Sequence, residues 1–284
     1  GGKLHPDIGI LWTGDKVVAC IDKPTMQFVN PLLKRKAFIW WNFPVSDYVR
    51  DRLLLGAVYG NGTDIDDDIS AFISNPMEHA EASKIALFSI ADYAWNMDAY
   101  KSDASWRRAV RYLMPGHAAA LQVFASHNSD LGGNEHDFRR EESEQIRPAL
   151  ERLLDAYCRE GKREVAAASA VTEECERMIA SADLLLASDE NPALIKEISP
   201  WLMQFKLLGE FGREVLCMLA AQCDGKKTEL EKAASHAKAL QVLMKKIDAT
   251  YNQNGFQPGV KTGSCHLKPA FDRLYQEVVQ RTGK

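Results

Sequence analysis

The sequence predicts an α/β region followed by an all-α region, because both composition and hydrophobic pattern change near residue 76. Glycine and proline supply 12 of the first 76 residues and 17 of the remaining 208, so turns concentrate in the first part. That part also holds short apolar runs, whereas later apolar residues recur at helical spacing. A chain of 284 residues can form one large domain or two ordinary ones, and we expect two regions.

Three short apolar runs predict the strands of the first region. They are Ile8 to Gly14, Ala37 to Val45 and Ala71 to Asn75, and each ends in polar or turn residues. Runs this continuous fit parallel strands that are buried on both faces. The stretches between them are long enough for crossover helices or loops, so the pattern predicts the end of an α/β barrel or of a doubly wound sheet.

The chain after Glu78 is predicted to be mainly helical. Residues 78–95 favour a helix, and Ser102 is the expected N-cap of a second helix that stops before Pro115. Apolar residues spaced by three, four or seven from 194 to 219 predict a longer helix, which Pro200 should kink or restart.

A heptad seam near the C-terminus has two interpretations. It fits the core of a helical bundle better than a groove for a partner, and its members are Leu230, Ala233, Ala237, Leu240, Met244, Ile247 and Tyr251.

Two loops interrupt the helical part. The first, His127 to His136, is rich in glycine and in possible ligands, and the second, Asn252 to Gly263, turns at Pro258-Gly259. For the first loop a hydrogen-bonded connection between helices is the simpler interpretation. The alternative is that the loop lines an extended substrate cleft.

Composition excludes several classes of function. The net charge of −4 and the mixture of both signs give no basic stripe for phosphates, so we expect no nucleic-acid partner. No apolar stretch reaches the roughly 18 residues of a membrane span. The six dispersed cysteines are expected to be small buried side chains. Since no phosphate loop or HExxH motif occurs, we expect no cofactor and no metal.

Polar side chains follow the predicted strands, at the edge where parallel strands carry their active sites. Thr13, Asn42 and Asn75 each come at or just after a strand end, and Asp47 follows five residues after Asn42. Trp40 and Trp41 precede Asn42 directly. An aromatic wall beside a carboxylate and carboxamides is a common way to bind a sugar, so we expect a carbohydrate site here.

Several segments of this chain resemble glycoside hydrolase family 84. The family contains β-N-acetylglucosaminidases, often called O-GlcNAcases, some of which are described as hyaluronidases. Bacterial members are the most similar, and the resemblance covers nearly the whole chain. The matching segments are Trp12 to Val17, Ile39 to Arg50, Val58 to Asn61, Asn75 to Glu81, His127 to Gly132, Tyr251 to Asn254 and Gln257 to Thr262.

The resemblance implies a role for each candidate residue. Asp47 resembles the carboxylate that holds the sugar O4 and O6 hydroxyls, and Asn75 the amide that binds a ring hydroxyl. Trp40 resembles part of the wall of the N-acetyl pocket, and Asn42 a residue that bonds near the catalytic carboxylates. The rim of the same pocket is matched by Thr13 and Val17.

The resemblance also implies a retaining, substrate-assisted reaction. The substrate's acetamide oxygen attacks C1, one aspartate orients the acetamide, and its neighbour acts as general acid and then base. We find no such pair on a strand of this chain and expect it upstream. The run Asp66-Asp67-Asp68 precedes an apolar run, whereas catalytic residues of a barrel follow one, so we interpret it as a solvated cap.

The resulting prediction is the C-terminal part of such an enzyme. Residues 1–76 would form the last strands of a (β/α)8 barrel, helices to about 135 would complete it, and residues 136–284 would form a helical bundle. The chain alone is expected to be inactive toward a glycan or glycoprotein that bears N-acetylglucosamine. Because a partial barrel exposes apolar surface, we expect a homodimer or association with the missing N-terminal part. The bacterial resemblance favours a periplasmic or secreted location.

A competing prediction is a non-catalytic module. In that case the chain would bind N-acetylglucosamine weakly, or its helices would serve only as an interaction scaffold.

Overall fold

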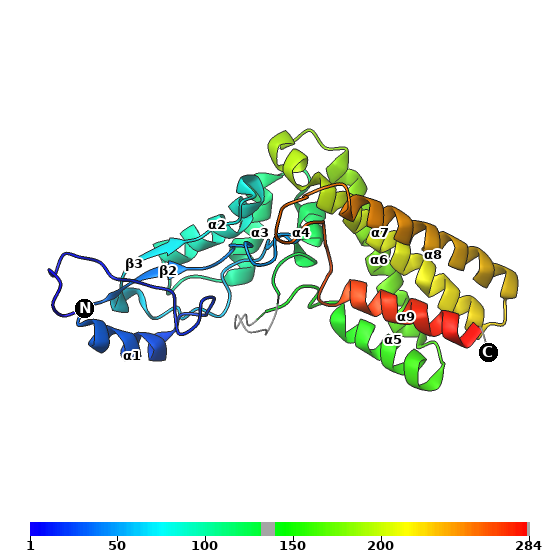
Figure 1. Cartoon of the computed structure of the whole chain (residues 1–284), viewed down its shortest axis with the longest axis horizontal. Helices are drawn as coiled ribbons and strands as arrows, with labels where there is room; N and C mark the ends of the chain where they lie inside the picture. The colour runs from blue at the N-terminus through cyan, green and yellow to red at the C-terminus, as the bar shows by residue number, and fades with distance from the viewer. Residues whose placement is uncertain (132–139, 283–284) are drawn as a thin grey trace. The chain divides into compact units, whose positions relative to one another are not determined.

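The computed structural model describes residues 1–131 and 140–282 and divides the chain into two compact units (Figure 1). Unit 1 comprises Gly1–Tyr48, Leu53–Ala118 and Ser129–Glu141, and unit 2 comprises Val49–Arg52, Ala119–Asn128 and Glu142–Lys284. In the described residues the fold is mostly helical, with nine α-helices and one small parallel sheet.

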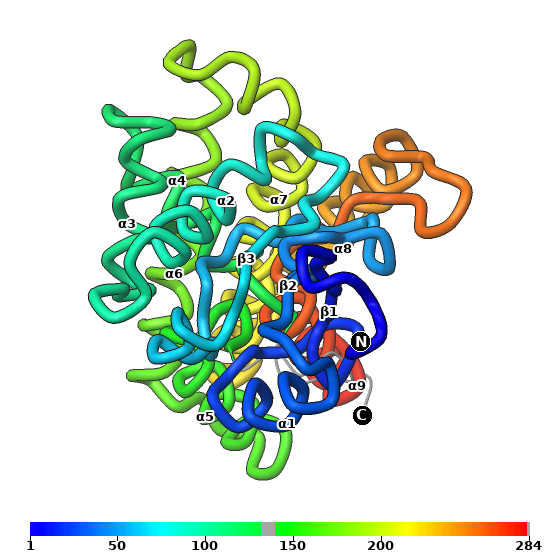
Figure 2. The backbone as a smooth tube through the Cα atoms, turned by 90° about the vertical axis from the view of Figure 1, so that its left-hand side faces the viewer, coloured from blue at the N-terminus to red at the C-terminus, as the bar shows by residue number. Residues whose placement is uncertain are grey.

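Unit 1 is built on a three-stranded sheet. Strands β1 (Leu11–Trp12), β2 (Ala37–Trp41) and β3 (Ile69–Ser74) pair in parallel in the order β1-β2-β3 (Figure 2). The predicted parallel strands are therefore confirmed, although the first is shorter than Ile8 to Gly14.

Burial alternates along β2 in a way that the sequence did not predict. Ala37, Ile39 and Trp41 are buried, whereas Phe38 is half-buried and Trp40 is 36% exposed. Successive side chains of a strand point to opposite faces of the sheet. The expectation that the strands are buried on both faces is thus wrong for β2 within the described chain, where one face is covered and the other is partly open.

Helices of unit 1 precede and follow the strands. Helix α1 (Lys23–Leu33) has Asp22 as its N-cap, and the Asp22 carboxylate accepts from the backbone N–H of Thr25 at 3.1 Å. A 3-10 turn, η1 (Asp66–Asp68), leads into β3, and α2 (Ala80–Trp95) and α3 (Ser102–Leu113) follow. Ser102 is the first residue of α3 and Lys101 occupies the N-cap, so the predicted cap is off by one residue.

A chain of aromatic rings joins the sheet to α2. The ring centroids of Trp41 and Phe72 are 5.8 Å apart, those of Phe72 and Tyr93 5.5 Å, and those of Tyr93 and Tyr100 5.3 Å. Tyr93 is fully buried and its hydroxyl donates to the carbonyl of Gly62 at 2.5 Å. These contacts fix the covered face of the sheet.

Unit 2 is a helical assembly around one long helix. Its members are α4 (Ala118–Ser126), α5 (Arg147–Glu160), α6 (Val165–Leu186), α7 (Pro192–Cys223), α8 (Lys227–Asp248) and α9 (Leu267–Thr282). Helix α7 packs against α6, α8 and α9, and Figure 1 shows α7 and α8 side by side. It continues through Pro200 and does not restart there.

The heptad seam lies mainly in the core of unit 2. Leu230, Ala233, Ala237 and Met244 are buried, and only Tyr251, beyond the end of α8, is clearly exposed. This burial on a helix that packs against α7 fits a core position better than an open groove.

The start of the first predicted loop is a buried polar connection. His127 is 2% exposed, and its ring nitrogens bond to the Ser143 hydroxyl at 2.8 Å and to the Glu174 carboxylate at 2.7 Å. Burial opposes ionisation of Glu174, but hydrogen bonds from His127 and Arg177 lower the pKa of this carboxyl. The bonds fit the interpretation as a connection between helices, and residues 132–136 of the loop lie outside the described residues.

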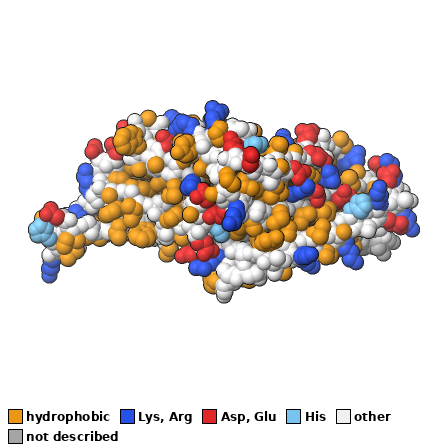
Figure 3. Space-filling model, turned by 90° about the horizontal axis from the view of Figure 1, so that it is seen from above, with side chains coloured by type: hydrophobic (Ala, Val, Ile, Leu, Met, Phe, Trp, Pro, Cys, Tyr) orange, Lys and Arg blue, Asp and Glu red, His pale blue; other side chains and the backbone are white. Residues whose placement is uncertain are grey.

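The described surface mixes both charges, as Figure 3 shows for one face. No helix in the described part of the chain is long and apolar enough to span a membrane. All six cysteines are free; Cys20 and Cys175 are buried, but Cys217 and Cys223 are exposed, so the expectation of six buried cysteines is wrong.

Glu142 is a carboxyl group in the core of unit 2. It is 3% exposed, and its side chain accepts from the backbone N–H of Cys265 at 2.5 Å. Burial raises its pKa to about 8. Since this value lies above the 4.5 of an ordinary glutamate, the folded chain holds a proton that the unfolded chain loses between about pH 4.5 and 8.

Replacing Glu142 by glutamine is therefore expected to flatten the pH dependence of stability. The wild-type free energy of unfolding should fall as pH rises from 5 to 8, by at most about 1.4 kcal/mol per pH unit for one proton. Glu142→Gln keeps an acceptor for Cys265 but removes the titration. Denaturant unfolding at several pH values measures this, with the exposed Glu144→Gln as control. Identical pH profiles for wild type and Glu142→Gln would contradict the assignment.

Candidate functional site

The carboxyl ends of β2 and β3 bring two asparagines together. Trp41 pairs with Ser74 in the parallel register, and the backbone N–H of Asn75 donates to the carbonyl of Trp41 at 2.9 Å. Asn42 and Asn75 are the next residues along their strands. Because the strands are parallel, both side chains are placed at the same edge of the sheet.

Asn42 is the centre of a hydrogen-bonded cluster. Its side-chain oxygen accepts from the indole N–H of Trp40 at 2.8 Å and from the Asn75 amide at 3.1 Å. Its own amide nitrogen donates to the backbone carbonyl of Val17 at 2.6 Å. We name Trp40, Asn42, Asn75 and the Val17 carbonyl the strand-end cluster. Asn42 is 8% exposed, so its bonds are largely shielded from water.

The strand-end cluster leaves part of Asn75 available. An amide has two N–H donors and one oxygen with two lone pairs. Asn75 uses one N–H on Asn42, and its side-chain oxygen has no partner among the described residues. The residue is half-buried, while Trp40 beside it is 36% exposed. An exposed indole next to an amide with an open donor and acceptor can bind a hydroxylated ring.

The structure relates the other predicted residues to this cluster to different degrees. Thr13 follows β1, and its hydroxyl donates to the Lys16 carbonyl at 3.4 Å. Val17 contributes its carbonyl, whereas its side chain is 71% exposed. Asp47 is exposed on the segment after β2. The structure therefore joins Trp40, Asn42, Asn75 and Val17 directly, and Thr13 bonds locally.

Buried contacts hold the segments that carry the cluster. The indole N–H of Trp41 donates to the Ala19 carbonyl at 2.8 Å, and the Ser74 hydroxyl donates to the Phe43 carbonyl at 2.7 Å. The rings of Trp41 and Phe43 lie 5.1 Å apart. Together these bonds fix the chain on both sides of Asn42.

The acidic run lies at the other end of β3. Asp66, Asp67 and Asp68 form η1, which precedes the strand, whereas Asn75 follows it. Asp68 forms an ion pair with Lys23 at 2.6 Å. No group of three or more His, Cys, Asp or Glu side chains in the described residues is arranged to hold a metal ion.

The sequence reasoning missed contacts that involve backbone atoms or distant residues. The carbonyls of Val17 and Ala19 anchor Asn42 and Trp41, and a backbone acceptor has no signature in the sequence. It also missed Tyr59, which is 39% exposed and lies 4.3 Å from the Arg140 guanidinium in a cation–π contact. The family resemblance of Val58 to Asn61 was the signal that could have drawn attention to it.

Comparison with known families gives two adjacent matches. The model of the beta-N-acetylglucosaminidase family matches residues 1–126. A second model, described as the post-catalytic domain of bacterial glycoside hydrolase family 84, matches residues 142–275.

Individual relatives agree with these matches. The protein O-GlcNAcase of Rattus norvegicus is 35% identical over 105 residues, which is 36% of this chain and 12% of the rat protein. The solved structure of CpGH84D has a TM-score of 0.86 and 27% identity, with 98% of this chain and 46% of that one covered. CpGH84B has a TM-score of 0.85 and 25% identity, with coverages of 96% and 46%.

This chain thus spans less than half the length of these two solved relatives and a small part of the rat protein. Matches to two family models, to a curated relative and to solved structures nonetheless agree. The chain belongs to glycoside hydrolase family 84, the family of β-N-acetylglucosaminidases and O-GlcNAcases.

Proposed function

We propose that the strand-end cluster is the substrate-binding side of an N-acetylglucosamine pocket in a retaining β-N-acetylglucosaminidase. The observation that carries this proposal is the bonding of Asn42 to both Trp40 and Asn75 at the carboxyl ends of neighbouring parallel strands. Active sites of α/β barrels are built at this edge. The substrate would be a glycan or glycoprotein with β-linked N-acetylglucosamine, as the family membership suggests.

Each residue then has a role that its chemistry supports. The open oxygen and N–H of Asn75 accept from and donate to one ring hydroxyl, and the Asp47 carboxylate accepts from the O4 and O6 hydroxyls. The half-open indole of Trp40 forms part of the wall around the N-acetyl group, and Thr13 and Val17 form its rim. Asn42 holds Trp40 and Asn75 in place, and its remaining N–H would bond near the catalytic carboxylates.

The domain assignment follows from the same proposal. Residues 1–76, with helices to about 135, would be the last strands and helices of a (β/α)8 barrel, and residues 136–284 a post-catalytic helical bundle. The three parallel strands of unit 1 and the helices of unit 2 are compatible with this division. In the family's reaction the acetamide of the substrate acts as nucleophile, so the protein must supply an adjacent pair of aspartates.

No described strand of this chain carries that aspartate pair at its carboxyl end. The only adjacent aspartates near a described strand are those of η1, which lie at the amino end of β3 and on the wrong side for catalysis. We propose that the pair is supplied by a segment outside these 284 residues and that this chain alone does not hydrolyse substrate. The competing proposal, a non-catalytic module, shares this expectation. It differs in sugar binding only if the module is a pure interaction scaffold, because the other version would bind N-acetylglucosamine weakly.

Incubation of the chain with an aryl β-N-acetylglucosaminide is expected to give no turnover, because under this proposal the chain does not supply the catalytic aspartate pair. Release of the aryl alcohol, followed by absorbance, measures this. Turnover that disappears in Asp67→Ala would contradict the proposal, since it would make the η1 aspartates catalytic.

Titration with N-acetylglucosamine is expected to change the fluorescence of Trp40 in a saturable way. Asn75→Ala or Asp47→Ala removes hydrogen bonds to the sugar and should weaken binding about tenfold, which corresponds to about 1.4 kcal/mol. Asp67→Ala, an acid of the same unit, serves as control. If no saturable change occurs, or if Asp47→Ala and Asn75→Ala bind like wild type, the scaffold alternative is supported and the pocket is not.

The barrel assignment also predicts self-association. Unit 1 exposes large apolar side chains, among them Leu11 at 50% and Phe28 at 68%, and under this proposal the missing part of the barrel would cover such surface. Light scattering is expected to show species larger than a monomer, and Phe28→Lys should reduce them. Phe256→Lys, an equally exposed phenylalanine of unit 2 at 66%, is the control. A monomer at all concentrations would argue against the barrel assignment.

A further inference from the structure

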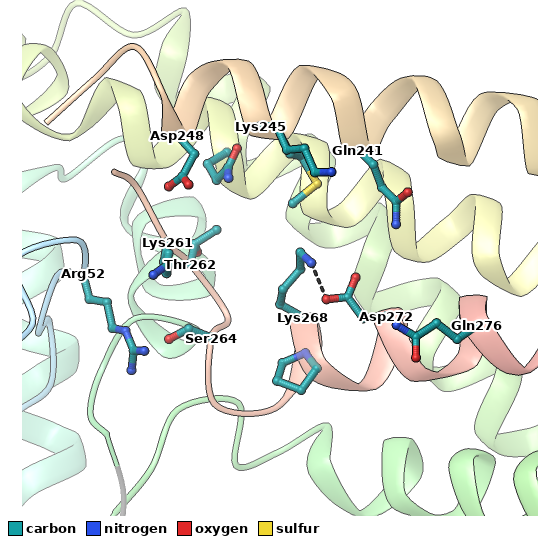
Figure 4. A pocket seen from close by; sticks show the side chains of 13 residues that line it. Arg52, Gln241, Lys245, Asp248, Lys261, Thr262, Ser264, Lys268, Asp272 and Gln276 are labelled. Atoms are coloured by element: carbon teal, nitrogen blue, oxygen red, sulfur yellow. Dashed lines mark hydrogen bonds and ion pairs between the residues drawn. The ribbon is translucent and has the colours of Figure 1, made fainter. Parts of the chain in front are cut away.

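Unit 2 contains a pocket that the proposed sugar site does not use. Its volume is about 550 Å³, within the range of ligand pockets, and every residue that lines it belongs to unit 2. Figure 4 shows side chains of α8, including Gln241 and Lys245, and side chains of α9, including Lys268 and Asp272, around a common space.

The pocket follows from the way in which the helices pack. Both α8 and α9 pack against α7, with Met244 and Phe271 among their buried residues. Residues spaced by three or four on each helix, such as Gln241 and Lys245 on α8, lie beside these core positions and line the gap.

The loop before α9 forms another part of the lining and is firmly anchored. The backbone N–H of Lys261 donates to the Asp51 carbonyl at 2.8 Å, and its ammonium bonds the Asp51 carboxylate at 2.5 Å. Two residues later, the N–H of Gly263 donates to the His127 carbonyl at 3.1 Å. These bonds hold the backbone on both sides of Thr262, which lines the pocket together with Ser264.

Two buried polar atoms in the lining have no partner in the described part of the chain. They are the side-chain oxygen of Gln204, a residue 6% exposed, and the hydroxyl of Thr262, a residue 4% exposed. Buried polar groups are nearly always hydrogen-bonded in native proteins. Both residues belong to the pocket lining, so a ligand hydroxyl could supply the partner that the protein does not.

The charges of the lining favour an anion. Four basic residues and two acidic ones line the pocket, and counting Asp51 as the partner of Lys261 leaves an excess of one positive charge. Both acids are engaged: Asp248 accepts from the Val260 N–H at 2.9 Å, and Asp272 pairs with Lys268.

Two of the basic side chains keep unused donors. Lys245 is exposed and lines the pocket, and no ion pair joins it to another described residue. The Arg52 guanidinium reaches Asp51 through Nε, at 3.5 Å, and its charge also acts on the buried Glu142 carboxyl, but its terminal nitrogens make no hydrogen bond within the described chain. A guanidinium with free terminal nitrogens is suited to a carboxylate or a phosphate.

We propose that this pocket binds a small organic anion that also carries hydroxyl groups, either a sugar acid or a sugar phosphate. Arg52 and Lys245 supply the positive charge for the oxyanion, and Gln204 and Thr262 bond to hydroxyls. The site is separate from the strand-end cluster, so it would give the helical unit a ligand of its own.

Isothermal titration of the full chain with D-glucuronate and D-glucose 6-phosphate tests the proposal, and D-glucose and inorganic phosphate are the comparison probes. At least one of the two sugar anions is expected to bind saturably at one site, and at least tenfold more tightly than glucose. Which of them binds identifies the oxyanion. Phosphate that binds as tightly as the sugar phosphate would overturn the role of the hydroxyls.

Variants locate the site. Lys245→Gln is expected to weaken binding of the sugar anion at least tenfold, whereas Lys246→Gln, its neighbour outside the pocket on the same helix, should bind like wild type. Thr262→Val should weaken binding without lowering the melting temperature, because its hydroxyl has no partner to lose. Asn75→Ala should have no effect. Absence of saturable binding by both sugar anions, or unchanged binding by Lys245→Gln, would overturn the proposal.

Discussion

The side-chain amide of Asn42 bonds at once to three segments of unit 1. Its oxygen takes the indole N–H of Trp40 and the amide of Asn75, and its nitrogen reaches the Val17 carbonyl. Because Asn42 is almost fully buried, loss of any of these bonds would leave a polar group without water or partner. The Asn42 amide thus sets the positions of the Trp40 indole and the Asn75 amide relative to each other. The Asn75 amide keeps an unused N–H donor and an unused oxygen acceptor, and the proposed sugar pocket depends on this arrangement.

Most elements of the fold could be predicted from the sequence because their patterns are local. The apolar run before Asn42 identified β2, and the heptad seam from Leu230 to Met244 identified the buried face of α8. Burial on both faces of the strands was expected from composition, and it failed at Trp40 because face coverage depends on which elements surround the sheet. Likewise, Pro200 was expected to kink or restart the helix, and α7 does not restart there.

The candidate site could be predicted only in part. Asn42 and Asn75 were identified from their place after predicted strands. Only the structure shows that Asn42 is the residue to which the other members of the cluster bond. Its partner at Val17 is a backbone carbonyl, and pairing of strands 33 residues apart decides which side chain meets which. No pattern in the sequence predicted the pocket between α8 and α9. Its two residues with unpartnered groups, Gln204 and Thr262, are far apart in the chain. Glutamine and threonine are also common residue types, so neither residue stands out in the sequence.

The central claim is that the strand-end cluster recognises N-acetylglucosamine. The most direct measurement is a two-dimensional ¹H–¹⁵N NMR titration with this sugar that follows the Trp40 indole and the Asn75 side-chain amide. The account predicts that both signals shift together and saturate with one affinity. In Asn42→Ala this coupled response should be lost, because the amide that bonds to both Trp40 and Asn75 is removed. If both signals stay unchanged while the sugar saturates shifts elsewhere, or if no signal shifts, the cluster is not the sugar site.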